Sequence, residues 1–526
     1  MKLLHNARIY TLNSSQPTAS ALVIDRERII EVGSEALLDE YNVRVDKEDM
    51  DGRVILPGFT DSHLHLQHYA LGLLGIDCET NTLAACLNRV SGRVSMLSPG
   101  EWVKGHGWNQ ANWPEGFGSV RDLDPVSPNN PVYLTAKSLH AAWVNTAALQ
   151  ISGINANTPD PRNGKFQRDE HGEPTGILFE TAMELVNRTI PRPDTKTIAT
   201  AISKAQTSLW RMGLTCVHDF DRRECFLALQ QLNERGDLHL RVIKSIPVED
   251  LPHAYAIGLR SGFGDDWLRI GSIKVFMDGA LGTRTAAMFQ PYLNEPGNRG
   301  MLNMDGEELF EIGRQAVEVG FSLAVHAIGD RANHEALAAF SRLRDHEKAN
   351  GIPALRHRIE HVQLIHPDDA GQLAKLNVVA SMQPVHAPSD MLMADRYWGE
   401  RASLAYAWRT QRNHGAILAF GSDAPVESPN PFHGLHAAVT RRRVDYSPGV
   451  EGWHPEQRLT MQEALEGYTI GGAYAACMDD RLGRLAPDYL ADLIVLNSDL
   501  FDCDQDDLLT LESSATMIGG EWVWLS

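Results

Sequence analysis

The sequence predicts an α/β fold in which a (β/α)8 barrel is joined to a small β-domain built from both ends of the chain. Three observations predict this fold. Short apolar, β-prone runs alternate with helix-patterned stretches, the signature of parallel strands with crossover helices. The runs number eight, as many as close a barrel of this type. The first 56 residues and about the last forty share a different pattern of short, alternating strands.

The β-domain is expected to comprise residues 1–56 and 480–526. Apolar and polar residues alternate here in short pieces, as they do in the hairpin strands of a small antiparallel unit. The expected strands are residues 7–12, 21–24, 28–33, 491–496 and 517–524.

The barrel is expected to span residues 57–479. A helix-patterned stretch at residues 334–348 is typical of the crossover helices that join parallel strands. The eight strands are predicted at residues 58–66, 214–220, 240–246, 270–277, 322–328, 357–362, 378–384 and 417–423.

Residues 67–200 are too many for one crossover between the first two strands, so we expect an inserted subdomain. Loops that follow strand ends form the active face of such barrels, and an insertion directly after the first strand would therefore cover the active site. Trp102, Trp108 and Trp113 in this segment would form either the core of the subdomain or an apolar substrate pocket.

Composition and charge exclude several classes of protein. The formal net charge of −20 over 526 residues repels phosphate backbones and disfavours nucleic-acid binding. The chain starts without an apolar stretch of signal-peptide length and contains no run long enough for a membrane span, so we expect no membrane partner and a cytosolic location. Homodimers are the commonest oligomers, which makes a homodimer possible.

Cysteine usage agrees with a reducing compartment. The six cysteines are scattered without a C-x-x-C pair, so neither a zinc knuckle nor a disulfide framework is predicted. We expect free thiols at Cys78, Cys86, Cys216, Cys225, Cys477 and Cys503.

Ionisable residues recur at the carboxyl ends of the predicted strands, where packing alone would need only apolar ones. His63 and His65 end the first strand, and the two-residue period of a strand places both on one face, where they can bind one metal ion. Further residues of metal-ligand type end the fourth, fifth, sixth and eighth strands: Lys274, His326, His361 and Asp423.

Imidazole and carboxylate ligands suit zinc best, and also manganese, iron or nickel. Four histidines and one aspartate are too many for one tetrahedral ion with an open position, which leaves two metals, or one metal plus catalytic groups. In the two-metal arrangement one ion is bound by His63, His65 and Asp423, and the other by His326 and His361. A bound divalent ion would activate water, and Asp423 would act as the catalytic residue that takes its proton and delivers it to the leaving nitrogen.

Lys274 lies inside an apolar β run, where an unpaired ammonium group is costly to desolvate. Carbamylation by carbon dioxide would convert the amine into a carboxylate able to bridge two divalent ions. The alternative is a buried lysine neutralised by Asp278 or Asp423.

The order His-x-His, Lys, His, His, Asp resembles that of the amidohydrolase superfamily of metal-dependent hydrolases. Longer stretches resemble one branch, the N-substituted formamide deformylase-like amidohydrolases (amidohydrolase family 3), and the similarity extends over nearly the full chain. These stretches are KVFMDGALGTRT at residues 274–285, NRG at 298–300, VHAIGDRAN at 325–333 and GSDAPVE at 421–427.

This resemblance implies a distorted barrel beside a small β-sandwich, with metal ligands at the positions derived above. It also implies hydrolysis of a C–N bond in an amide-like or cyclic substrate. Branch members carry an insert with a stretch similar to HAAWVN at residues 140–145, which implies a substrate role for His140. Residues 138 and 139 are Ser-Leu where many relatives have Asp-Gly. Members with one ion and with two share much of the pattern, so the resemblance leaves the number of metals open.

Further substrate-binding candidates lie near other strand ends. Arg284 would clamp a substrate carbonyl or carboxylate, or form a salt bridge with an acid of the insertion. His218 would hydrogen-bond substrate or orient a metal ligand. Gln383 and His386 end the seventh strand and are expected to contact substrate, whereas Glu360 should point away from the side of His361 and pack against core or helices.

The sequence therefore predicts a metal-dependent amidohydrolase that acts on the amide, N-formyl or cyclic-amide bond of a small molecule. The same site could deaminate a heterocycle or open a lactone. A third possibility is a catalytically silent relative that binds a metabolite and acts as a regulator.

Overall fold

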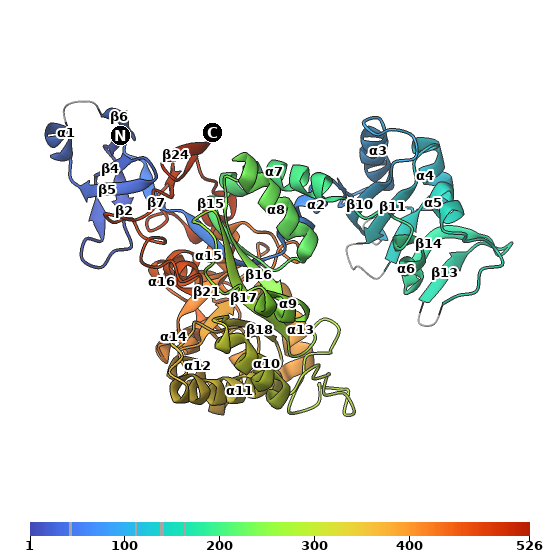
Figure 1. The fold of residues 1–526 in the computed structure, drawn as a ribbon. Helices are drawn as coiled ribbons and strands as arrows, with labels where there is room; N and C mark the ends of the chain where they lie inside the picture. Colours follow the sequence, from blue (N-terminus) through green and yellow to red (C-terminus); the bar gives the residue numbers. More distant parts are fainter. Residues whose placement is uncertain (42–44, 111–112, 137–140, 162–163) are drawn as a thin grey trace. The chain divides into compact units, whose positions relative to one another are not determined.

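The computed structural model describes residues 1–41, 45–110, 113–136, 141–161 and 164–526. These residues divide into two compact units, one of residues 1–69 and 202–526 and the other of residues 70–201. Figure 1 shows the elements of each unit along the chain. The first unit holds every predicted metal ligand.

The centre of the first unit is a parallel sheet of eight strands, which confirms the predicted fold class. The order in the sheet is β21-β20-β19-β18-β17-β16-β15-β8, so each strand pairs with its neighbours in sequence, as in a (β/α)8 barrel. The strands are β8 (Phe59–Leu64), β15 (Leu214–Asp219), β16 (Arg241–Pro247), β17 (Leu268–Phe276), β18 (Leu323–Ala327), β19 (Arg358–His361), β20 (Val379–Met382) and β21 (Leu418–Phe420).

The first and last strands meet just beyond their ends. A single parallel bridge joins Leu64 to Ala424. The Asp423 amide donates to the His63 carbonyl at 2.6 Å, and the His65 amide donates to the Ala424 carbonyl at 2.8 Å. The seam therefore closes through the backbone of three predicted metal ligands, which fixes their positions relative to one another.

Helices connect the strands of the barrel (Figure 1). The longest, α11 (Asp330–Ala349), includes the helix predicted at residues 334–348 and buries Ala336, Leu337 and Phe340 along one face. The others are α2 (Leu66–Gly72), α7 (Thr195–Arg211), α8 (Arg223–Arg235), α9 (Leu251–Ala256), α10 (Gly306–Glu318), α12 (Gln372–Lys375), α13 (His386–Trp398), α14 (Trp408–Asn413), α15 (Pro431–Thr440), α16 (Met461–Glu466) and α17 (Gly472–Ala475).

Both ends of the chain contribute to two small sheets in the same unit. One sheet has the order β5-β4-β1-β6 and the other β24-β23-β22-β7-β2-β3. Their strands are β1 (Lys2–His5), β2 (Arg8–Tyr10), β3 (Thr18–Ala19), β4 (Ala21–Asp25), β5 (Arg28–Gly33), β6 (Asp46–Asp49), β7 (Val54–Pro57), β22 (Leu493–Leu496), β23 (Ala515–Ile518) and β24 (Glu521–Leu525), with the short helix α1 (Leu37–Glu40) between β5 and β6.

These sheets differ from the predicted antiparallel unit in two ways. The pairs β1·β6 and β2·β7 are parallel, so the sheets are mixed. The run expected at residues 517–524 is a hairpin, because Gly519 and Gly520 have φ values of 58° and 77° and turn the chain between β23 and β24. Periodicity could not reveal this turn, since apolar residues continue on both sides of it.

A buried ion pair joins the terminal sheets to the barrel. The Arg241 guanidinium at the start of β16 donates to both carboxylate oxygens of Asp492, at 2.6 and 2.8 Å, and stacks over Trp267. Asp492 also accepts from the Gly519 amide at 2.9 Å. Because both charges are buried and fully hydrogen-bonded, removing either partner alone would be strongly destabilising.

The second unit is built on one six-stranded sheet with the order β13-β14-β12-β11-β10-β9. Trp108, Trp113 and Trp143 lie in its buried core and Trp102 packs against a neighbouring cluster, so these tryptophans have the core role. That this unit covers the active site stays a prediction. Its elements are β9 (Ile76–Asp77), α3 (Leu83–Val94), β10 (Val103–Trp108), α4 (Val120–Val126), β11 (Val132–Ala136), β12 (Ala141–Val144), α5 (Thr146–Ile151), β13 (Gly164–Arg168), β14 (Pro174–Glu180) and α6 (Ala182–Asn187).

All six cysteines are free thiols in the structure. No helix in the described part of the chain has both the length and the apolar character that crossing a lipid bilayer requires.

Candidate metal centre

Three of the predicted ligands meet at the carboxyl ends of β8 and β21. The Nε2 atoms of His63 and His65 each lie 3.5 Å from Asp423 Oδ1. The two histidines project from one side because they are two residues apart at the end of a strand. Asp423 has φ of 60°, a left-handed conformation that turns the chain directly after β21. The result is two imidazole nitrogens and one carboxylate oxygen around a common point.

Hydrogen bonds to the opposite ring nitrogens orient both histidines. His63 Nδ1 donates to Glu360 Oε2 at 2.6 Å, and His65 Nδ1 donates to Asp221 Oδ1 at 3.2 Å. An imidazole that donates from Nδ1 presents the lone pair of Nε2, the form in which it binds a metal. Glu360 and Asp221 therefore hold the two histidines in the tautomer and orientation that a metal ion requires.

His326 and His361 stand beside this group. The ring centroid of His361 lies 5.0 Å from that of His63 and 4.6 Å from that of His326. His361 Nδ1 donates to Gln383 Oε1 at 2.8 Å, which leaves Nε2 free, and His326 Nε2 donates to the Gly279 carbonyl at 3.0 Å, which leaves Nδ1 free. Four histidines with fixed tautomers thus line one site.

Burial keeps His63, His326 and His361 neutral. Desolvation, assisted by the nearby positive charge of Lys274, lowers the pKa of His63 well below its ordinary value and that of His326 to about 3. The pKa of His361 is also far below its ordinary value, because of burial and the neighbouring His326 and His63. Metal ligation requires neutral imidazole, so the electrostatics agree with the geometry.

Lys274 is buried in this site. Among the described residues none accepts a hydrogen bond from its Nζ, which lies 4.7 Å from the ring centre of Phe220 and 4.8 Å from that of Phe276. Burial lowers the pKa of Lys274 to about 8. Asp278 is occupied by the amides of Ile328, Gly329 and Ala287, so the alternative of an ion pair with Asp278 is not formed.

The prediction for Glu360 was wrong. Arg358 and Glu360 occupy alternate positions of β19, both face the barrel interior, and Glu360 accepts from Arg358, Ser381 and His63. His361 reaches the same interior only because its φ is 76°, which breaks the alternation of the strand. Glu360 therefore lies among the predicted metal ligands and orients His63.

The predicted substrate residues have different surroundings. Gln383 orients His361, and His386 at the start of α13 stacks on His361 with ring centroids 6.3 Å apart. His218 accepts at Nδ1 from the Arg358 guanidinium at 2.7 Å. In the described part of the chain the Nε2 atoms of these three side chains are buried and have no hydrogen-bond partner.

Arg284 forms an ion pair with Glu295 at 2.7 Å, so the salt-bridge alternative is realised with an acid of its own loop and not of the insertion. His140 lies outside the described residues.

Sequence reasoning missed Asp221 and His68. Asp221 Oδ1 accepts from His65 and from His68 Nδ1 at 2.5 Å, and Asp221 Oδ2 accepts from the Gln67 amide at 2.5 Å. Burial alone would raise the pKa of Asp221, but the two histidine hydrogen bonds lower it below the ordinary range. The sequence did contain a signal for Asp221: Asp219 and Asp221, at and just after the end of β15, have the same spacing as a His-x-His pair.

The donors present fit a divalent transition metal. His63, His65 and Asp423 place one ligand atom each within 4.8 Å of one another, and His361, His386 and Asp423 do the same. Two imidazole nitrogens and one carboxylate oxygen are a donor set typical of catalytic zinc. The second ion was expected at His326 and His361. Within the described residues His326 joins no such three-ligand group, and His386 stands in its place.

Comparison with known sequences identifies the family. A sequence profile described as the amidohydrolase family matches residues 47–524. The chain belongs to this family. It is 32% identical to the putative amidohydrolase YtcJ of Bacillus subtilis, over 99% of this chain and 98% of YtcJ. It is 27% identical to the N-substituted formamide deformylase of Arthrobacter pascens, over 98% of this chain and 97% of the deformylase. The resemblance to this branch is thus confirmed.

Solved structures of amidohydrolase relatives agree with this assignment. The fold is similar to the crystal structure of an uncharacterized metal-dependent hydrolase from Pyrococcus furiosus, with a TM-score of 0.80 and 30% identity. The similarity covers 95% of this chain and 100% of that one. Together, the family and this neighbour support a metal-dependent hydrolase.

Proposed function

We propose that this amidohydrolase cleaves a C–N bond, in an amide, N-formyl or cyclic-amide group of a small molecule, with one or two divalent ions that are most readily zinc. The observation that carries the proposal is the convergence of two oriented imidazole nitrogens on Asp423 Oδ1, at 3.5 Å each. The name of the deformylase relative supports the bond class, since that protein acts on N-substituted formamides.

His63, His65 and Asp423 would hold the ion. A bound divalent ion supplies a Lewis acid that activates water and polarises the carbonyl under attack. Glu360 and Asp221 keep the two imidazoles aimed at one point, which avoids the reorganisation that loose ligands would need during the reaction.

Asp423 is the group placed to move the proton. Burial raises the pKa of its carboxyl above the ordinary value, which brings it closer to neutral pH. A carboxylate of raised pKa takes a proton from the attacking water more readily and can then release it to the amide nitrogen as the C–N bond breaks. Removing its ionisable oxygen should therefore abolish turnover without disturbing the core.

Lys274 is proposed to carry a carbamate. Its neutral amine would attack carbon dioxide, form an N–C bond and release one proton, which yields a carboxylate in place of a buried ammonium. Two observations support this proposal. Nζ has no hydrogen-bond partner in the described residues, although Glu360 and Asp423 attract it, and Lys274 lies close to His63, His326 and His361. A carbamate there would add a carboxylate ligand for a divalent ion beside the imidazoles of this site.

Elemental analysis and a substrate panel test the proposal. Purified protein should contain about one to two equivalents of a divalent metal per chain, and the zinc-loaded enzyme should hydrolyse a member of an N-formyl, N-acyl or cyclic-amide panel. Asp423→Asn should abolish this activity, whereas Asp368→Asn, at an aspartate 91% exposed, should retain it. Turnover of only lactones or amino-heterocycles would reject the C–N amide class, and reconstituted protein inert on every class would reject an enzyme.

A further inference from the structure

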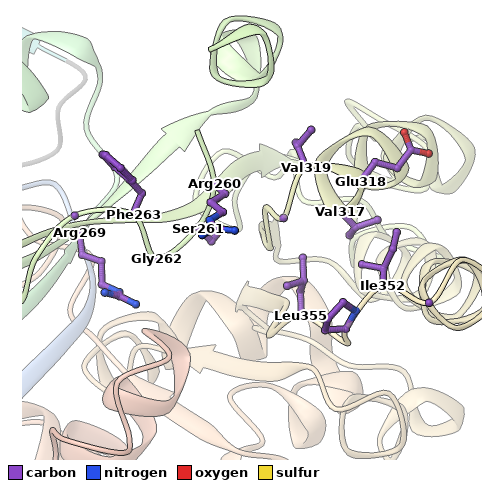
Figure 2. Close-up of a pocket in the computed structure, with 14 residues that line it drawn as sticks. Arg260, Ser261, Gly262, Phe263, Arg269, Val317, Glu318, Val319, Ile352 and Leu355 are labelled. Atoms are coloured by element: carbon purple, nitrogen blue, oxygen red, sulfur yellow. The ribbon is translucent and has the colours of Figure 1, made fainter. Parts of the chain in front are cut away.

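A second cavity lies at the opposite end of the barrel from the metal ligands. It has a volume of about 880 Å³. Its walls come from residues 260–264 and 269 before and in β17, residues 317–320 at the end of α10 and before β18, and residues 351–353 and 355 before β19 (Figure 2). These segments are at the amino ends of the strands, whereas the metal ligands end them. Arg269 and Lys274 are five residues apart on β17, or about 16 Å at strand spacing.

Two arginines line this cavity without a protein partner. Within the described residues, neither Arg260 nor Arg269 makes a side-chain hydrogen bond or an ion pair, and Arg269 Nε is buried and unsatisfied. Burial, with repulsion from Arg481, lowers the pKa of Arg269. A buried, unsatisfied guanidinium donor is uncommon in a folded protein, because its desolvation is not compensated.

The nearby acids are already paired. Glu318, which also lines the cavity, accepts from Arg314 at 2.8 Å and lies 3.5 Å from His346. Asp266 lies 3.0 Å from Arg481 and 3.8 Å from Arg28. Asp266 and Asp480 attract Arg269 without bonding to it. The cavity therefore keeps two guanidinium groups that have no hydrogen-bond or ion-pair partner among the described residues.

The backbone leaves room for the Arg269 guanidinium. Gly262 has φ of 85°, and a Cβ atom there would lie 3.0 Å from Arg269 Nη2. The Gly262 amide is held by the Ile270 carbonyl at 2.8 Å, so this close approach is fixed by the hairpin that precedes β17. The turn at Gly262 thus allows the Arg269 guanidinium to lie close against the backbone.

The rest of the wall is largely apolar. Val317, Val319, Ile352 and Leu355 face the same space as the arginines (Figure 2). Phe263 at the rim is 63% exposed, so its ring is accessible to a ligand in the cavity. A ligand that satisfied this surface would carry an anionic group for the guanidinium donors and an apolar body for the aliphatic wall.

We propose that this cavity is a second binding site, separate from the hydrolytic site, for a small organic anion with an apolar body, such as an aryl or aliphatic carboxylate. Arg260 and Arg269 would bind the carboxylate, and Phe263 with the valines and Leu355 would cover the apolar body. The proposal does not depend on the reaction at the metal centre.

Isothermal titration calorimetry of the metal-loaded protein with 4-phenylbutyrate tests the proposal. We expect binding that weakens by about tenfold or more in the double variant Arg260→Gln/Arg269→Gln. Arg235→Gln, which removes an exposed arginine on α8 that has no ion pair in the described chain, should leave it within about twofold. 4-Phenyl-1-butanol, which lacks the charge, and inorganic phosphate, which lacks the apolar body, should each bind about tenfold more weakly.

Three results would overturn the proposal. These are the absence of phenylbutyrate binding at millimolar concentration, equal affinity in the double variant and the wild type, and phosphate or phenylbutanol binding as tightly as phenylbutyrate. If the double variant fails to fold, Phe263→Ser at the exposed rim tests the same proposal. It should weaken phenylbutyrate and leave phosphate unchanged, and unaltered phenylbutyrate binding in that variant would reject the site.

Discussion

Replacing Asp221 by asparagine tests how the metal centre is positioned. Three N–H donors share the two carboxylate oxygens: His65 Nδ1 and His68 Nδ1 on Oδ1, and the Gln67 amide on Oδ2. Asparagine offers one oxygen and one NH2 group, so in either orientation of the amide an N–H donor faces another donor. The variant must therefore lose either the hold on His65 or the bond to the Gln67 backbone.

The size of the effect follows from this geometry. Loss of a carboxylate that orients a metal-bound histidine weakens metal binding by about 10- to 100-fold, or about 1.4–2.8 kcal/mol. Loss of the backbone bond instead would leave a donor unsatisfied, at about 1–3 kcal/mol of unfolding free energy. We expect the first outcome, because the backbone of Gln67 is fixed at the start of α2 while the His65 ring can turn.

Competition with a zinc chelator measures the metal affinity of Asp221→Asn, and circular dichroism on the same samples shows that it is folded. His68→Ala is the matched control, since it removes another donor from the same oxygen and leaves the bond to His65. The control should bind zinc within about twofold of the wild type. A folded Asp221→Asn protein with wild-type zinc affinity would refute the claim that Asp221 orients His65.

The remaining predictions concern the carbamate, an acidic pH range and the terminal core. Native mass spectrometry should find the mass of one added carbon dioxide that disappears in Lys274→Gln, and a free amine in active protein would contradict carbamylation. Burial opposes ionisation of Glu463, but hydrogen bonds from Arg409 and Thr460 lower its pKa to about 2, below the 4.5 of the unfolded chain. This stabilisation, about 1 kcal/mol after solvent screening, is complete above pH 4.5 and is lost as the pH falls towards 2. Urea unfolding should therefore separate Glu463→Gln from wild type at pH 7 and less so at acidic pH, and a constant difference would be inconsistent with linkage. Leu493→Ala, in the buried core of the terminal sheets, should lower the free energy of unfolding by about 2–5 kcal/mol, and a change below about 1 kcal/mol would show that this core is not tightly packed.

The sequence alone determined the barrel and the types of its ligands. Strand period and apolar runs are local properties, so eight strands and the shared face of His63 and His65 could be read from contiguous residues. An ionisable residue at the end of an apolar strand is also visible locally, because packing gives no reason for it. For this reason His326, His361, Lys274 and Asp423 could be proposed as ligands from the sequence, without any knowledge of their neighbours.

Only the tertiary structure decided which partner each of these residues has. Glu360 holds His63 from a strand 297 positions away, and Asp221 holds His65 from another, pairings that depend on the register of the closed sheet. His361 enters the site through a left-handed backbone, a conformation that no local pattern announced. The same is true of Lys274, whose Nζ has no hydrogen-bond partner among the described residues, since whether an acid reaches a buried amine depends on the strands folded around it. Local periodicity fixes the face on which a side chain lies, but its partners are fixed by packing between residues far apart in the chain.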